Sequence, residues 1–236
     1  MKKPQINHLA LFIALIAICL MSCSRESTSE GGSPAEIVAT IVLDDSIGVT
    51  NVIAIVENDY SYQGFDIIAR CNFENNGFNL KLPASLAKKY LDDYFDPKMM
   101  SNPNAKCAAI EDIIGLNKKG EMIGSFALED ETGESRAVYY YSDRNFSVKG
   151  RDIYYEGNYE EHYVVECEFT KGWNLVYEYS TETIKDSKTI YKWITSTQKP
   201  SNINFSWKFY GEFEDKKGGG VMKKLSYVGF KFSTMK

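Results

Sequence analysis

Histidine is scarce in this chain of 236 residues, which holds two histidines and five cysteines. His8 lies in the N-terminal leader, so a histidine-based triad or metal site would depend on His162 alone. The cysteines have no CxxC spacing, and the chain has neither a GxSxG nor a GxxxxGK[ST] motif. We therefore predict a non-enzyme with no catalytic residues, no metal ion and no cofactor, and we interpret His162 as an exposed residue at a strand edge.

Apolar runs of membrane-spanning length are also missing. The run Leu9–Met21 has 13 residues, whereas a transmembrane helix needs roughly 20. It follows two lysines and precedes a small residue, as in a secretory signal. Its end, LMSC, resembles the bacterial lipobox, in which the signal is removed and the new N-terminal cysteine is acylated. We predict a signal peptide over residues 1–22 and a lipid on Cys23 that anchors the protein to a membrane without spanning it.

The chain also lacks an excess of basic residues. The net charge is −5, and it becomes −7 without residues 1–22, which hold two lysines and no acid. Such a chain is a poor partner for nucleic acid, which binds basic surfaces. Residues 23–34 are rich in Ser and Gly and are expected to form a tether. The lipobox resemblance, with Ser24 rather than Asp after the cysteine, implies the outer membrane as the location.

Helical periodicity is rare, and period-two alternation dominates the chain. The expected strands are 37–43, 51–58, 65–73, 77–83, 121–130, 135–143, 146–150, 161–169, 173–180, 188–196, 203–213 and 225–233. Turns of residues 74–77 and 131–134 join two pairs of strands into hairpins. One short helix is expected over residues 84–95, where Leu86, Tyr90, Leu91 and Tyr94 have helical spacing.

These elements predict an all-β protein with two antiparallel β-sandwich-like parts and one short helix. Residues 35–97 form the first β domain, with the helix, and residues 106–236 form the second. The stretch between them, DPKMMSNPNAK, is typical of a linker.

A family resemblance accompanies this pattern. The motifs GFNLKLP, YYYSDRNFSVKG and KGWNLVY, together with the lipobox LMSC, resemble uncharacterised lipoproteins of Bacteroidota. The resemblance implies a lipid anchor and an all-β architecture whose first part is transthyretin-like. It implies no catalytic or binding residues, because the group has no established activity.

Several residues have two interpretations. Cys71 and Cys167 are interpreted as small buried residues rather than as a disulfide with each other or with Cys107. Trp173 and Trp207 each stand in an alternating apolar row and are interpreted as core. The acids, including Glu129, Glu160, Glu161, Glu166 and Glu168, are interpreted as solvated rather than as a paired glycosidase site.

Tyrosines supply the candidate ligand contacts. Tyr154, Tyr155 and Tyr159 lie in DIYYEGNYEE, which is too polar for a core and is expected to be a loop that exposes its rings. Scattered exposed rings are the plainer alternative. We expect a lipid-anchored outer-membrane or cell-surface protein, a non-catalytic module that binds a glycan or a protein. The alternatives are a fimbrillin-like structural subunit and a glycan-active hydrolase.

Overall fold

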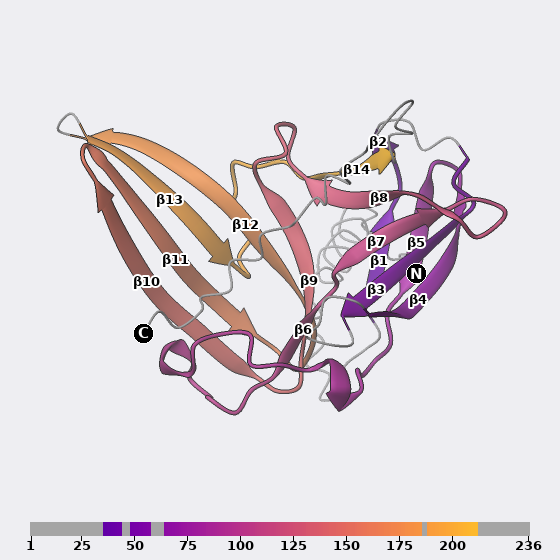
Figure 1. Cartoon of the computed structure of the whole chain (residues 1–236), viewed down its shortest axis with the longest axis horizontal. Helices are drawn as coiled ribbons and strands as arrows, with labels where there is room; N and C mark the ends of the chain where they lie inside the picture. Colours follow the sequence, from indigo (N-terminus) through magenta and orange to yellow (C-terminus); the bar gives the residue numbers. More distant parts are fainter. Residues whose placement is uncertain (1–34, 44–47, 58–63, 186–187, 212–236) are drawn as a thin grey trace, which may run out of the picture. The chain divides into compact units, whose positions relative to one another are not determined.

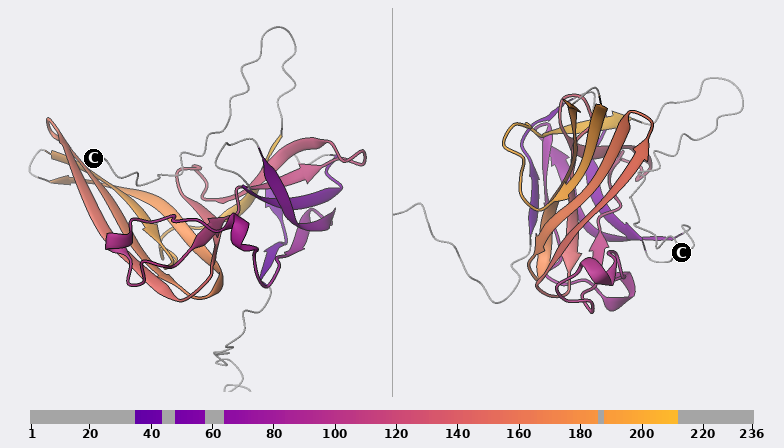
Figure 2. Two further views of the ribbon diagram at one scale, coloured as in Figure 1. Left: turned by 60° about the horizontal axis from the view of Figure 1, so that its bottom comes forward. Right: turned by 90° about the vertical axis from the view of Figure 1, so that its left-hand side faces the viewer.

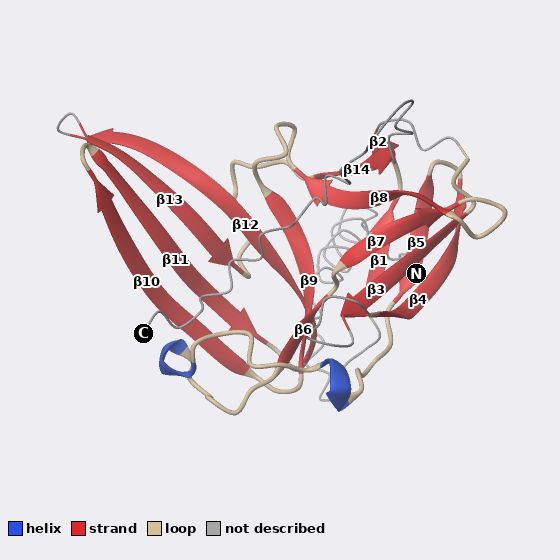
Figure 3. Ribbon diagram, in the orientation of Figure 1, coloured by secondary structure: helices blue, strands red, loops and turns tan. Residues whose placement is uncertain are grey.

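The computed structural model describes residues 35–43, 48–57, 64–185 and 188–211, which all belong to one structural unit. Most of these residues are in strands, and the helices among them are two 3₁₀ turns of three residues each (Figure 3). The all-β prediction is confirmed. The predicted signal peptide and the tether with Cys23 lie outside the described residues.

Figure 1 labels the strands in chain order. They are β1 (Glu36–Ala39), β2 (Val42–Leu43), β3 (Asn51–Glu57), β4 (Phe65–Glu74), β5 (Gly77–Lys81), β6 (Cys107–Ala109), β7 (Asp112–Leu116), β8 (Met122–Glu129), β9 (Arg136–Ser142), β10 (Phe146–Glu156), β11 (Tyr159–Phe169), β12 (Gly172–Lys185), β13 (Lys188–Ser196) and β14 (Ser206–Gly211). The 3₁₀ turns are η1 (Lys88–Tyr90) and η2 (Pro97–Met99).

The described strands form one mixed sheet. Its order is β1–β5–β4–β3–β7–β8–β9–β12–β13–β11–β10, and β14 pairs with β8 and β2 while β6 pairs with β9. All pairs are antiparallel except β11 with β13 and β14 with β2. The four strands β12, β13, β11 and β10 lie side by side (Figures 1 and 2). We call them the β10–β13 ladder.

Local turn chemistry explains the first hairpin. Asn75 and Asn76 have φ angles of 53° and 58° and join β4 to β5. Two left-handed residues match the twist of the flanking strands, and asparagine tolerates this conformation better than most residues. The Asn76 side chain also donates a hydrogen bond of 2.9 Å to the Val42 carbonyl. The turn predicted at residues 74–77 is confirmed.

Two large hydrophobic clusters stabilise the sheet. The first gathers buried residues from β1, β3, β5, β8 and β14, including Ile37, Val52, Leu80, Phe126 and Trp207. The second includes Tyr140, Phe146, Val165, Cys167 and Phe169, from β9, β10 and β11. Each buried apolar side chain contributes about 1.5–3 kcal/mol relative to an exposed one.

A long connection covers the second cluster. Residues 91–106, which we call the strap, contribute Phe95 to it, and Met99 and Met100 pack against it. The strap lies beside β10 (Figure 2), where Met100 forms a bridge with Val148. The helix predicted over 84–95 is therefore wrong beyond the single turn η1. The physical reason is tertiary: an extended strap places successive side chains on the sheet, which outweighs helical propensity.

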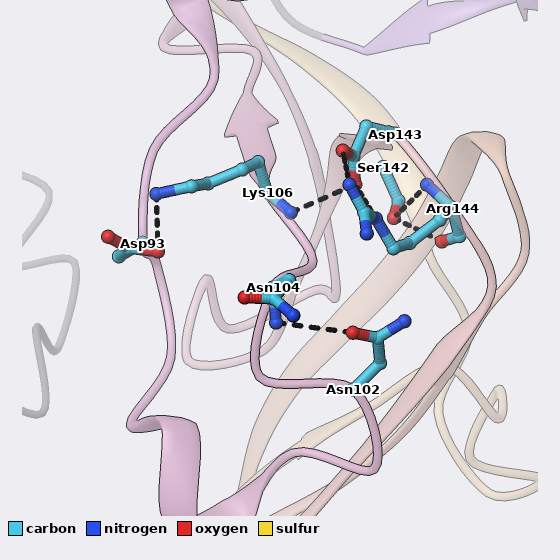
Figure 4. Close-up of polar contacts among 7 residues, drawn as sticks. All are labelled: Asp93, Asn102, Asn104, Lys106, Ser142, Asp143 and Arg144. Atoms are coloured by element: carbon cyan, nitrogen blue, oxygen red, sulfur yellow. Dashed lines mark hydrogen bonds and ion pairs between the residues drawn. The ribbon is translucent and has the colours of Figure 1, made fainter.

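A polar network fixes the end of the strap (Figure 4). The Lys106 amide donates to Asp143 Oδ1 at 2.9 Å, and the Asp143 amide donates to the Lys106 carbonyl at 3.1 Å. The guanidinium of Arg144 lies 2.7 Å from Asp143 Oδ2, and the Lys106 ammonium lies 2.6 Å from Asp93. Burial raises the pKa of Asp143, but these partners outweigh it, so the net shift is downward.

The hydrogen-bonded sheet continues across the predicted domain boundary. β3 precedes the strap and β7 follows it, yet the two strands pair from Asn51↔Leu116 to Ile55↔Asp112. Strands β8 and β14, which belong to the predicted second domain, also supply buried residues to the first cluster. The division into 35–97 and 106–236 stays a prediction.

Candidate ligand-binding surface

Five aromatic side chains lie on one face of the β10–β13 ladder, at the end where β10 turns into β11. Partner residues on neighbouring strands share a face. The pairs Tyr154↔Glu161, Glu161↔Tyr191 and Tyr163↔Trp193 therefore place these side chains together, and Tyr159 lies two residues before Glu161. We call Tyr154, Tyr159, Tyr163, Tyr191 and Trp193 the aromatic face.

The rings contact one another and remain accessible. The Tyr154 and Tyr163 centroids are 5.5 Å apart with nearly perpendicular planes, and Tyr159 and Tyr191 are stacked at 6.4 Å. Tyr154 and Tyr159 are each 52% exposed and Trp193 is 38% exposed. The strap covers the same face along the first half of β10, where Met99 packs against Gly150 and Met100 bridges Val148. The described residues thus leave a patch of aromatic rings open to solvent.

Carboxylates accompany the rings on this face. Asp152 is the partner of Tyr163, and Glu182 is the partner of Tyr191. The Tyr163 hydroxyl donates a hydrogen bond of 2.9 Å to Glu161. Burial first, and then Glu161, raises the pKa of Tyr163. The pKa of Tyr191 is raised mainly by the negative charge of Glu182. Glu161 and Glu182 thus place negative charge beside the Tyr163 and Tyr191 hydroxyls.

The opposite face has different chemistry. It carries Tyr155, which is 70% exposed, because Tyr155 alternates with Tyr154 along β10. His162 also lies on this face and is only 5% exposed, so its predicted exposure is wrong. Its Nδ1 lies 2.8 Å from Arg151 Nη2, and its Nε2 lies 3.3 Å from Glu160. Since arginine only donates, Nδ1 is the acceptor and Nε2 carries the proton.

The ion pairs of Glu160 explain how a polar ring is tolerated there. Glu160 accepts from both His162 and Lys188, and the Lys188 contact measures 3.0 Å. The pKa of Glu160 is lowered, chiefly by Lys188. The histidine is thus held in a hydrogen-bonded row and is not presented to a substrate.

The structure separates the three tyrosines selected from the sequence. It brings Tyr154 and Tyr159 together and places Tyr155 on the other face. The expected loop is in fact the ends of β10 and β11, joined at Gly157 and Asn158. Tyr163, Tyr191 and Trp193 were missed. Their alternation within each strand was visible, but the adjacency of β11 and β13 was not.

A small pocket is the second feature of interest. It lies where β6 leaves β9 and β7 joins β8, and we call it the fork pocket. Its volume is about 100 Å³, below the roughly 300 Å³ of the smallest typical ligand sites. Its lining includes the acids Glu111, Asp112, Glu129 and Glu178.

Charges in the fork pocket are mostly partnered. Arg136 lies 2.6 Å from Glu178. Glu129 is buried and accepts a hydrogen bond of 2.6 Å from Tyr210, so its predicted solvation is wrong. Burial raises the pKa of Asp112 to about 6, although its carboxylate accepts a hydrogen bond from the Ile113 amide. The pocket holds acids without room for a sugar ring between them.

The other predicted positions divide as follows. Trp207 is buried and Trp173 packs against the first cluster, which confirms both as core. Glu166 and Glu168 are exposed, as predicted. Cys167 is buried, and Cys71 is partly buried. In the described part of the chain Cys71, Cys107 and Cys167 are free thiols, and no group of three or more His, Cys, Asp or Glu side chains could hold a metal ion.

Comparisons with known proteins found no match. No family model, no curated protein and no solved structure matches the chain. Among the described residues, no helix has the length and apolar character needed to cross a bilayer. The lipobox and the resemblance to Bacteroidota lipoproteins stay predictions.

Proposed function

We propose that this chain is a lipid-anchored, non-catalytic binding protein of the bacterial outer membrane, and that the aromatic face binds a glycan. One observation carries the proposal: three strands present five aromatic rings on one face, and three of the rings are 38–52% exposed. Monomeric proteins rarely gather exposed aromatics in one patch without a binding role.

The chemistry of the face suits a sugar. Flat rings such as Trp193 offer apolar area to the C–H face of a pyranose, while tyrosine hydroxyls stay at the wet rim. The carboxylates of Asp152, Glu161 and Glu182 are acceptors for sugar hydroxyls. Because the rings lie on strands, their spacing is set by the sheet and little ordering is needed on binding.

The fork pocket supports the non-catalytic part of the proposal. A glycosidase places two carboxyl groups on either side of a sugar. A cavity of about 100 Å³ has room for about three water molecules. One of the acids that line it, Glu178, forms an ion pair with Arg136.

The anchor completes the proposal. A lipid on Cys23 would hold the chain at the membrane, and residues 24–34 would separate the β sheet from the bilayer by roughly 17–20 Å on average. The aromatic face would then meet soluble or surface glycans near the membrane.

Glycan-array binding of the purified lipoprotein in detergent tests the proposal. Trp193→Ala should lower the affinity at least tenfold, because truncation of a central aromatic contact costs about 2 kcal/mol. Tyr155→Ser is the matched control, since it removes a more exposed ring from the opposite face. Equal binding by the parent and Trp193→Ala, or an equal loss in Tyr155→Ser, would show that the aromatic face is not the binding surface.

A further inference from the structure

The carboxylates of the aromatic face have no cationic side chain beside them on the described strands. Among the side chains that the structure describes, the charged ones on this side of β10–β13 at the turn end are Asp152, Glu161 and Glu182, with no lysine or arginine beside them on these strands. Lys98 belongs to η2, whose Met99 packs at Gly150, so it borders the face. An occupant that fits this surface carries ammonium groups for the acids and apolar groups for the rings, since both carboxylates and aromatic faces attract cations.

The chain itself contains such a segment. Residues 221–236, VMKKLSYVGFKFSTMK, have four lysines and no acid, and they include Tyr227, Phe230 and Phe232. By contrast, residues 24–34 have one arginine, two glutamates and no aromatic residue. Residues 221–236 lie outside the described part of the chain, so only their sequence and length bear on their role.

We propose that residues 221–236 dock on the aromatic face of their own chain, with their lysines at Asp152, Glu161 and Glu182. The chain is long enough. β14 and β13 are four strand spacings apart in the sheet, about 19 Å, and the nine residues 212–220 between Gly211 and the segment reach about 30 Å when extended.

The consequence rests on the proposed function: the segment competes with the glycan. If it covers the face nine-tenths of the time, its removal raises the apparent glycan affinity about tenfold.

Zero-length carbodiimide cross-linking of the full mature chain, followed by peptide mass spectrometry, tests the docking without any glycan. The reagent joins a lysine to a carboxylate that it touches, with loss of water. Cross-links are expected from Lys223, Lys224 or Lys231 to the three acids of the face. The pairs Lys188–Glu160 and Lys149–Glu168, each at 3.0 Å on the opposite face, are the built-in positive controls.

Two results would overturn the docking. One is formation of the control cross-links without any from residues 221–236 to the aromatic face. The other is that, in an equimolar mixture of ¹⁴N and ¹⁵N protein, about half of these cross-links join a ¹⁴N peptide to a ¹⁵N peptide, as random pairing of separate chains requires, which would assign the segment to a second copy.

Glycan binding by a chain that ends at Gly220 separates the two proposals. If the cross-links to the aromatic face form but neither the full chain nor the chain that ends at Gly220 binds a glycan, the proposed function is refuted and the docking stands. Glycan binding that is equal in both chains refutes the competition.

Discussion

Trp207 joins the last described strand to the first, and its loss should destabilise the whole sheet. The side chain is 8% exposed, and its ring lies 5.2 Å from that of Phe78 in an edge-on contact. Its indole N–H donates to the Val38 carbonyl at 3.2 Å. Replacement of a buried tryptophan by alanine costs about 3–5 kcal/mol. The orphaned carbonyl of Val38 favours the upper part of that range.

Thermal and urea unfolding measure this cost. For a domain of this size 1 kcal/mol lowers Tm by about 2–4 °C, so Trp207→Ala should lower it by roughly 6–20 °C. Trp207→Phe keeps a ring against Phe78 and loses the hydrogen bond, so it should cost less than half as much. Trp193→Ala, from the exposed face, should stay within about 1 kcal/mol of the parent. A Trp207→Ala protein as stable as the parent, or no more affected than Trp193→Ala, would refute the reasoning.

Three further predictions follow from the structure. Folding raises the pKa of Asp112 from 3.8 to about 6, so its contribution to stability declines between about pH 4 and pH 6, by up to about 3 kcal/mol; urea midpoints of Asp112→Asn should lack this decline, and an unchanged pH profile would argue against it. Gly150→Ala puts a Cβ against the sulfur of Met99 and should cost about 1–3 kcal/mol; adding Met99→Ala should recover part of the loss in a double-mutant cycle, and additive losses would dismiss the clash. Cys23→Ala should abolish incorporation of labelled palmitate, and continued labelling would disprove the lipobox.

Alternation in the sequence predicted much of the fold. Because side chains on a strand alternate strictly, the rows of Trp207 and Cys167 were placed in the core correctly, and the two asparagines before Gly77 marked their turn. The same rule predicted that Tyr154 and Tyr155 point in opposite directions only once they were known to lie in a strand. Placing them in a loop lost that information.

The order of the strands could not be read in the same way. Periodicity assigns a side chain to a face but does not say which strand lies next to it. Tyr163 and Trp193 are 30 residues apart, and their meeting depends on a parallel pair that no turn motif announces. His162 had a polar sequence neighbourhood, yet its ring is buried, and its Nδ1 lies 2.8 Å from Arg151 on β10. The extended conformation of the strap likewise depends on contacts with residues distant in sequence, in the second cluster and on β10.

The parallel pairing of β11 with β13 has a consequence for how the binding surface arises. β10 with β11, and β12 with β13, are two hairpins of local contacts, and hairpins form in microseconds. The register Tyr159↔Thr189 to Glu166↔Ser196 joins them across a much longer stretch of chain, and such pairings form more slowly. Tyr154, Tyr159 and Tyr163 belong to one hairpin, while Tyr191 and Trp193 belong to the other. Neither hairpin alone contains the aromatic face, so a newly synthesised chain completes this face only when the joining step is finished.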